Sequence, residues 1–295
     1  MLWLARGVWV LLPITAGGAI EAAIDGWSIA PRTVAAILVL STWTMVAVAL
    51  LVPRPRSFTL LRIGAPAIAG ATIAAMTSTD VLFAVVAGGH SIIAAVLTLS
   101  GPVALACTDG ASYGDEQRHP LRLPPHFILL VVPATVVLLT ASVAAGPLLL
   151  ADGRWPAGAP VTIIGVLFAF VLVRSLANLE RRFVVLVPAG IVVSDSLTLV
   201  DPVLLPREHV RSLRRAVDTT RGLPAARPGV LDLRLGTANA LELVTDEAAP
   251  IPCRDGRRLT RTIVTERLLF APLRPAALLA AWQERVSARD RAQPR

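Results

Sequence analysis

The sequence predicts an α-helical transmembrane bundle of about six spans, followed by a small, mostly β cytoplasmic domain. Three observations lead to this fold class. Hydrophobic residues make up 55% of the 295-residue chain, and its mean hydropathy is +0.67, whereas soluble domains contain about 45–50% apolar residues. Long apolar runs fill the chain up to residue 181. After that point short apolar runs alternate with charged residues and turn pairs.

The first part contains six runs that are long enough to cross a membrane. A bilayer core of about 30 Å needs ~20 apolar residues in a helix. Candidate spans lie near 7–24, 33–52, 59–77, 81–100, 127–150 and 159–177. The connections contain turn-forming residues, such as the Asp-Gly pairs at 25–26 and 152–153. We expect the first run to be a retained span and not a cleaved signal peptide, because it reaches span length and more spans follow.

The distribution of arginine predicts the orientation, because cytoplasmic flanks retain positive charge. With the N-terminus inside the cell, the outer side has only Arg32 and Arg154. The inner side has nine arginines, namely Arg6, Arg54, Arg56, Arg62, Arg118, Arg122, Arg174, Arg181 and Arg182. We therefore expect a multi-pass protein of the cytoplasmic (plasma) membrane with cytoplasmic N- and C-termini.

Charge also predicts the domain boundaries. Residues 1–181 have ten Arg and eight acidic residues, whereas 182–295 have 18 Arg and 12 acidic residues. We assign 1–181 to the transmembrane domain, with a cytoplasmic loop near 104–126. Residues 182–287 form the predicted β domain, and 288–295 form a basic tail that we expect to be disordered.

The pattern of the second part is typical of antiparallel strands that end in a helix. The apolar runs FVVLVP, IVVS, LTLV, VLLP, LDLRL, LELVT and TERLLFAP are separated by turn residues. The segment PAALLAAWQERV begins with Pro275 in a first helical turn, and Leu278, Trp282 and Val286 recur on one face. A small barrel closed by one amphipathic C-terminal helix accommodates both signals.

Two stretches carry a resemblance to known families. RRFVVLVPAGIVVSDSLTLVDPVLLPREHVRSL, together with LLFAPLRPAALLAAWQER, resembles the bacterial pleckstrin-homology-like (PH-like) domains that are attached to membrane spans. The loop SYGDEQRHPLR resembles one in uncharacterised polytopic membrane proteins of high-GC Gram-positive bacteria. The first resemblance implies a PH-like barrel with a C-terminal helix. Neither resemblance supplies a catalytic residue.

The polar loop between the fourth and fifth spans is the first candidate site. We interpret it as a binding or docking loop that contains Ser112, Tyr113, Asp115, Glu116, Arg118, His119 and Arg122. We favour docking on the β domain through Arg–carboxylate pairs. A substrate or headgroup site is one alternative, and a metal held by Asp115, Glu116 and His119 is another. A single Glu-x-x-His copy is weak support for a metal, so we expect no metal and no cofactor.

Four ionisable residues fall within the predicted spans, where charge is costly and often functional. Arg62 and Arg174 lie near the inner boundary, where their side chains can reach the interface, which leaves Glu21 and His90 as candidates. Glu21 lies near the outer end of the first span and His90 midway along the fourth. A proton or cation path through both is one hypothesis. A buried histidine bonded to a carbonyl or hydroxyl group is the more common arrangement.

Clustered arginines in the β domain are the third candidate. We expect lipid or partner contact at Arg207, Arg211, Arg214, Arg215, Arg257 and Arg258, with Arg254 and Arg261 beside the last two. Each arginine near an anionic leaflet contributes on the order of 1 kcal/mol to the free energy of membrane binding. A solvated surface explains the same pattern equally well. Nucleic acid is excluded as a partner, because the sequence lacks aromatic interleaving and a recognised motif.

These observations lead to two hypotheses about function. The sequence has no Walker loop, GxSxG elbow, HExxH motif or kinase signature. We favour a non-enzymatic integral membrane protein whose cytoplasmic PH-like domain binds a protein partner or the inner leaflet, in assembly or regulation of an envelope-related complex. Its partners would be membrane lipids, another membrane protein or a second copy of itself. The alternative is a small secondary transporter or lipid-modifying enzyme that uses His90, Glu21 and the Tyr113–His119 loop.

Overall fold

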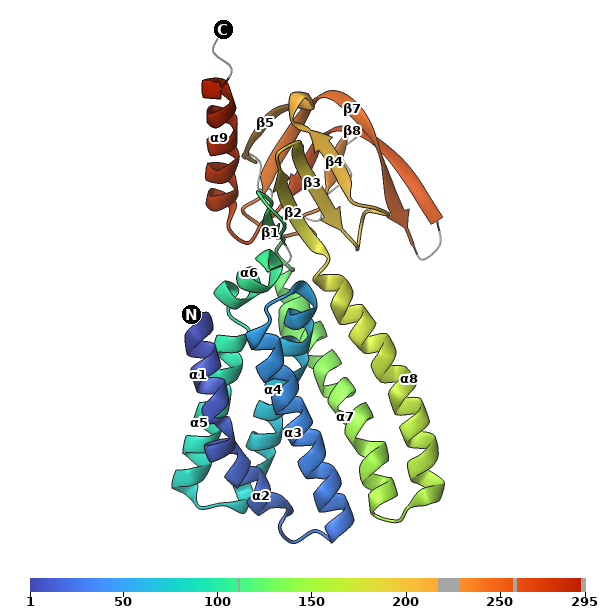
Figure 1. Cartoon of the computed structure of the whole chain (residues 1–295). Helices are drawn as coiled ribbons and strands as arrows, with labels where there is room; N and C mark the ends of the chain where they lie inside the picture. Colours follow the sequence, from blue (N-terminus) through green and yellow to red (C-terminus); the bar gives the residue numbers. More distant parts are fainter. Residues whose placement is uncertain (111, 217–228, 257–258, 293–295) are drawn as a thin grey trace. The chain divides into compact units, whose positions relative to one another are not determined.

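The computed structural model describes residues 1–110, 112–216, 229–256 and 259–292, and it divides into two units. The helical unit consists of Met1–Gly110 and Leu129–Ala177, and the β unit consists of Ala111–Ile128 and Asn178–Arg295. Figure 1 shows the helices of the first unit and the strands of the second. Of the loop near 104–126 that the sequence placed with the transmembrane domain, residues 104–110 belong to the helical unit and the rest to the β unit.

Six helical stretches of the helical unit are long and apolar enough to cross a membrane, which makes the chain a multi-pass membrane protein. They are Leu2–Ile24, Ile29–Leu51, Pro55–Ser78, Val81–Thr98, Phe127–Ala151 and Trp155–Leu179. Each overlaps one of the six predicted spans. The first comprises α1 (Leu2–Leu12), the π-helix η1 (Pro13–Gly17) and α2 (Gly18–Ile24); the others contain α3 (Ile29–Leu51), α4 (Pro55–Ala75) with the 3-10 turn η2 (Met76–Ser78), α5 (Val81–Thr98), the π-helix η3 (Phe127–Val131) with α7 (Val132–Ala151), and α8 (Trp155–Leu179).

Local chemistry fixes several helix ends. The Asp80 carboxylate accepts a hydrogen bond from the Phe83 N–H at 3.0 Å and caps the N-terminus of α5. α5 ends at Thr98, and a separate short helix, α6 (Gly101–Asp109), begins with Pro102 in its first turn. Pro is well tolerated there because it has no N–H to leave unsatisfied. The fourth span therefore stops before Pro102 and does not continue past it.

Buried side chains of the helical unit come mainly from α4 and α5, with further ones from α1 and α3, whereas α7 and α8 expose many large apolar residues. Trp9, Leu50 and Leu61 are fully buried. On α8 the exposed residues include Ile163, Ile164, Leu167, Phe170 and Val171. Water would not solvate so continuous an apolar surface. Lipid is the solvent that these helix faces require.

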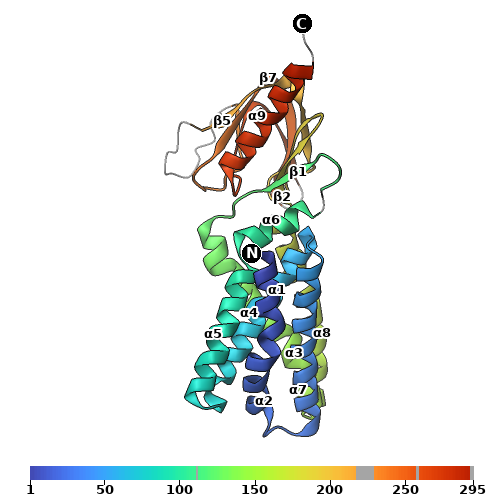
Figure 2. The same cartoon turned by 60° about the vertical axis from the view of Figure 1, so that its left-hand side comes forward.

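The β unit has two four-stranded sheets among the described residues. Their orders are β1-β2-β3-β4 and β5-β7-β8-β6. The strands are β1 (Gln117–Pro120), β2 (Arg182–Val187), β3 (Gly190–Asp195), β4 (Val203–Pro206), β5 (Val210–Arg215), β6 (Val230–Asp232), β7 (Leu241–Asp255) and β8 (Leu259–Phe270), with a 3-10 turn η4 (Arg207–His209) between β4 and β5. A final helix, α9 (Pro275–Ala292), follows and packs against β5 (Figure 2).

Two predicted features of the β unit differ from the structure. The run LTLV forms no named strand and contributes only an isolated bridge, Leu199 with Cys253. The reason is the Asp195 carboxylate, which accepts from the Leu197 N–H at 3.0 Å and holds a turn there. α9 continues through Ala292, into the segment that we expected to be a disordered tail. Residues 293–295 lie outside the described part.

The core of the β unit lies between the sheets and α9. Leu186, Ile191 and Leu243 from the strands are fully buried, and Leu278 and Trp282 of α9 belong to the same cluster. Val286 packs against that cluster. The apolar face predicted from helical spacing is thus the face that α9 buries.

Candidate functional site

The polar loop enters the β unit as an edge strand. Residues of β1 pair antiparallel with β2, with Gln117 opposite Leu186 and Pro120 opposite Phe183. Beyond β1 the Leu121 N–H donates to the Arg182 carbonyl at 3.0 Å. Main-chain hydrogen bonds therefore hold the loop on the β unit. Such pairing fixes the backbone much more firmly than exposed ion pairs would.

The far side of this segment is bonded to the chain just before α9. The Arg122 N–H donates to the Ala271 carbonyl at 2.8 Å, and the Leu273 N–H donates to the Pro120 carbonyl at 2.8 Å. The Arg122 guanidinium donates to the Leu273 carbonyl at 3.2 Å. The loop is thus inserted between β2 and the segment that leads into α9.

A buried ion pair connects the loop to β2, β3 and the chain just after β6. Arg182 and Asp195 form a two-pronged pair, with N–O distances of 2.9 and 3.1 Å, and both side chains are almost completely buried. Arg182 also donates to the carbonyls of Arg122 at 3.1 Å and Leu233 at 2.8 Å. Desolvating two charges is costly unless every polar atom has a partner. This pair has such partners, and sequence reasoning used Arg182 only as a topology signal.

The other loop side chains have different surroundings. Arg118 forms an ion pair with Glu116 at 3.4 Å and lies over the Phe183 ring, 5.5 Å from its centroid. Tyr113 is 88% exposed. His119 is half-buried opposite Val184, and Ser112 is also half-buried. Across the residues that the structure describes, no three His, Cys, Asp or Glu side chains cluster as a metal site would require.

Part of the loop lines a groove beside α9, which we call the α9 groove. The groove has a volume of about 590 Å³, and all its lining residues belong to the β unit. One wall is loop segment 114–117, the second is the β2–β3 turn at Val187 and Pro188, and Arg207 lies between β4 and β5. α9 contributes Ala281, Trp282, Glu284, Arg285 and Ala288.

Both arginines of the α9 groove donate to main-chain carbonyls. The Arg207 guanidinium donates to the Arg285 carbonyl at 2.5 Å and lies 5.9 Å from the centre of the Trp282 ring. The Arg285 guanidinium donates to the Asp115 carbonyl. A carbonyl is neutral, so these bonds leave both positive charges in place. The lining also includes the carboxylates of Asp115, Glu116 and Glu284, so the groove offers charges of both signs beside an apolar surface.

In the helical unit, His90 connects α5 to the first span. Its Nε2 lies 2.9 Å from the Val8 carbonyl oxygen, and its Nδ1 lies 2.6 Å from the Thr15 hydroxyl. A carbonyl can only accept, so Nε2 carries a proton and donates it to the Val8 carbonyl. Both ring nitrogens are occupied by structural hydrogen bonds. This favours the structural interpretation of His90.

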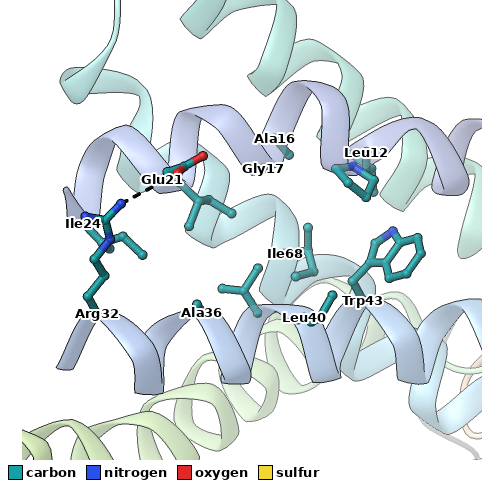
Figure 3. Close-up of a pocket in the computed structure, with 13 residues that line it drawn as sticks. Leu12, Ala16, Gly17, Glu21, Ile24, Arg32, Ala36, Leu40, Trp43 and Ile68 are labelled. Carbon is teal, nitrogen blue, oxygen red and sulfur yellow. Dashed lines mark ion pairs between the residues drawn. The ribbon is translucent and has the colours of Figure 1, made fainter. Parts of the chain in front are cut away.

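Glu21 lines an apolar groove between the first span and α3, which we call the α1–α3 groove. Its volume is about 290 Å³. Glu21 lies 3.7 Å from Arg32, which also pairs with Asp25 at 2.8 Å. Figure 3 shows Glu21 and Arg32 facing one another at one end of the groove, with Leu12 and Trp43 at the other. His90 does not line this groove, so the structure does not bring Glu21 and His90 together in it.

Acidic partners compensate two arginines of the first predicted patch. Arg211 pairs with Asp246 at 2.9 Å and Arg214 with Glu242 at 3.0 Å, across β5 and β7. Arg215 is exposed at the end of β5. Arg254 donates to the Leu199 carbonyl at 2.9 Å. The remaining members of the second patch are Arg261, which is exposed, and Arg257 and Arg258, which lie outside the described residues.

Comparison with known proteins supplies no relative from which a site could be transferred. No family model, curated protein or solved structure matches the chain. The chemistry of the two grooves is therefore the basis for any functional proposal. One is polar and lies beside α9, and the other is apolar with charges at one end. Sequence reasoning identified Asp115, Glu116, Arg207 and Glu21 among their lining residues but had no signal that grouped them with Trp282, Arg285 or Arg32.

Proposed function

We propose that this is a non-enzymatic integral membrane protein of the cytoplasmic membrane whose C-terminal PH-like domain binds a segment of a protein partner in the α9 groove. The partner would be a component of an envelope-related complex that the protein helps to assemble or regulate. Two sheets followed by a helix support the PH-like assignment. The α9 groove itself is the single observation that carries the binding proposal.

The lining of the groove, in which two arginines lie beside three acidic residues, suits an extended protein segment that carries charges of both signs. Two guanidiniums, of Arg207 and Arg285, bond to carbonyl groups, so a carboxylate of the partner can pair with either one. Val187, Pro188 and Ala281 supply apolar surface next to these charges. Charge-assisted bonds beside a small apolar surface provide both orientation and contact area. We therefore expect a segment with a carboxylate next to an apolar side chain.

A protein partner fits the surface charges better than the inner leaflet does. Binding to anionic lipid depends on several uncompensated basic residues close together. Arg211 and Arg214 each have an acidic partner within 3.0 Å. Their field is thereby reduced, and the carboxylates that line the α9 groove reduce the field of its arginines in the same way.

Site-specific photo-crosslinking in membranes of the source cells tests this proposal. A photoreactive amino acid replaces Glu284, which lines the groove, or its neighbour Gln283, which is exposed and does not. We expect a discrete crosslinked protein from position 284 and none from 283. Crosslinks to lipid alone from 284, or equal crosslinking at both positions, would contradict the proposal.

Filling the groove gives a second, matched test on the full-length chain. Ala281→Trp places a large ring in the groove, and Ala280→Trp places the same ring on an exposed position of α9 outside it. We expect the first change to abolish the crosslink from position 284 and the second to leave it intact. Thermal unfolding of both variants separates a blocked groove from a misfolded domain. Persistence of the crosslink in a folded Ala281→Trp variant would refute a partner in this groove.

A further inference from the structure

We infer that the α1–α3 groove binds one phospholipid whose head group carries both a phosphate and a primary ammonium, with one acyl chain lying along the groove. The inference concerns the helical unit alone. It goes beyond the proposed function and does not depend on it. Its evidence is the apolar lining of the groove, its length and the charges at its end.

The groove exists because the first span changes its packing partner along its length. α1 packs mainly against α5 and also against α3, to which Trp9 is joined by two hydrogen bonds with Trp43. The π-helix Pro13–Gly17 follows, and α2 then packs mainly against α4. π-helical segments are often found at functional sites. The divergence of α2 from α3 leaves an opening, with Ile68 of α4 among its lining residues.

The lining of the groove between its ends is apolar. It includes Leu12, Ala16, Ile20, Val39 and Leu40. Water in such a channel at membrane depth would lack hydrogen-bond partners. Hydrocarbon is thus the natural occupant, and a volume of about 290 Å³ is close to the lower limit of ordinary ligand sites, which is about 300 Å³.

The length of the groove matches one leaflet. Arg32 and Trp43 lie 11 residues apart on α3, as the difference of their numbers gives. At 1.5 Å per residue this is about 16 Å along the helix. Half of the hydrocarbon core of a bilayer is about 15 Å thick. An acyl chain that starts at Arg32 would therefore end near Trp43, in the middle of the membrane.

The charges at the open end select the head group. Asp25 holds Arg32 at 2.8 Å, while Glu21 lies farther from it, at 3.7 Å, with its side chain 73% exposed. The formal charges of Glu21, Asp25 and Arg32 sum to one net negative charge. Arg32 can pair with a lipid phosphate, and Glu21 can accept hydrogen bonds from a primary ammonium. A phosphoethanolamine head group presents both groups.

Native mass spectrometry of the full-length protein in detergent tests this inference. The protein is titrated separately with phosphatidylethanolamine, phosphatidylcholine and phosphatidylglycerol of identical acyl chains. Phosphatidylcholine has a quaternary ammonium without N–H donors, and phosphatidylglycerol has no ammonium. We expect one phosphatidylethanolamine to bind about tenfold more tightly than either of the others, as one charge-assisted hydrogen bond would provide. Equal affinity for all three lipids would overturn the inference.

Two pairs of variants locate the lipid. Glu21→Gln should reduce the preference for phosphatidylethanolamine to within about twofold, whereas Asp152→Asn, at another turn of the helical unit, should preserve it. Ala36→Trp fills the groove and should abolish tight binding, whereas Ala22→Trp, at an exposed position of α2 outside the lining, should not. Thermal unfolding shows whether each variant is folded. Tight binding by a folded Ala36→Trp variant would place the lipid elsewhere and refute the inference.

Discussion

Trp9 and Trp43 connect α1 to α3 by exchanging hydrogen bonds. The Trp9 indole N–H donates to the Trp43 carbonyl at 3.1 Å, and the Trp43 indole N–H donates to the Trp9 carbonyl at 3.0 Å. Pro13, four residues after Trp9, has no N–H with which to continue the helical ladder. Trp43 thus supplies a donor to a carbonyl that the helix itself leaves without one. Hydrocarbon chains have no N–H or O–H group, so lipid could not replace the Trp43 donor.

Trp43→Phe should lower the free energy of unfolding by about 1–3 kcal/mol, because it leaves the Trp9 carbonyl without a donor. The same change in a Pro13→Ala background should cost less. Alanine restores a main-chain N–H that can donate to Trp9. Denaturant unfolding in detergent measures the four proteins of this double-mutant cycle. An equal cost in both backgrounds would show that Pro13 does not create the need for Trp43.

His90→Leu should destabilise the helical unit by about 1–3 kcal/mol, because it leaves the Val8 carbonyl and the Thr15 hydroxyl without their partner. His90→Gln should recover most of that loss, since its amide offers both a donor and an acceptor. Thermal unfolding and protein abundance in membranes are the measurements. A His90→Gln variant that is abundant and stable but loses a cellular phenotype would instead support the transporter or enzyme hypothesis.

Arg182→Ala should destabilise the β unit by about 3–5 kcal/mol, because it leaves the buried Asp195 carboxylate without its counter-charge. Replacing both residues with apolar ones, Arg182→Met with Asp195→Leu, should cost less than the sum of the single changes. Arg211→Ala is the exposed control and should cost less than about 1 kcal/mol. Urea unfolding of the full-length protein reports these differences. Comparable losses from Arg182→Ala and Arg211→Ala would contradict a stabilising role for the buried pair of Arg182 and Asp195.

The Cys253 thiol makes the free energy of unfolding of the β unit depend on pH. Burial raises the pKa of the Cys253 thiol, and the nearby Arg261 charge lowers it by a smaller amount. Between the unfolded pKa, about 8.5, and the raised folded pKa, the folded protein keeps a proton that the unfolded chain has lost. Stability therefore falls as pH rises through this window. Cys253→Ala should make the decline above about pH 8 shallower, and an unchanged slope in unfolding experiments would refute this assignment.

The spans were predictable because lipid imposes one simple requirement, about 20 apolar residues in a row. The position of the polar loop that contains β1 was not predictable from the sequence. β1 is only four residues long, Gln-Arg-His-Pro, and its partner β2 lies beyond two further spans. Such a short polar segment has no periodicity that distinguishes a strand from a loop. Its pairing is set by tertiary contacts at Arg122 and Arg182.

The same limit applies in the β unit. No strand was predicted at β5, because its Val-Arg-Ser-Leu-Arg-Arg sequence is rich in arginine; lipid or partner contact at its arginines stays a prediction. Its Arg211 and Arg214 are compatible with a strand because Asp246 and Glu242 face them from β7. LTLV was predicted as a strand from composition, but Asp195 forms a turn there. Both differences depend on residues far away in sequence or on a single side-chain hydrogen bond.

β1 and β2 flank the hairpin of α7 and α8 in sequence, and their pairing requires that both lie on one side of the membrane. The account places that side in the cytoplasm. Labelling of single introduced cysteines in intact cells, with a membrane-impermeant maleimide, is the most direct test. The chain with its two native cysteines, both buried, serves as the blank. We expect Tyr113→Cys to react only after the cells are permeabilised and Ser28→Cys to react in intact cells; labelling of Tyr113→Cys in intact cells would contradict the account.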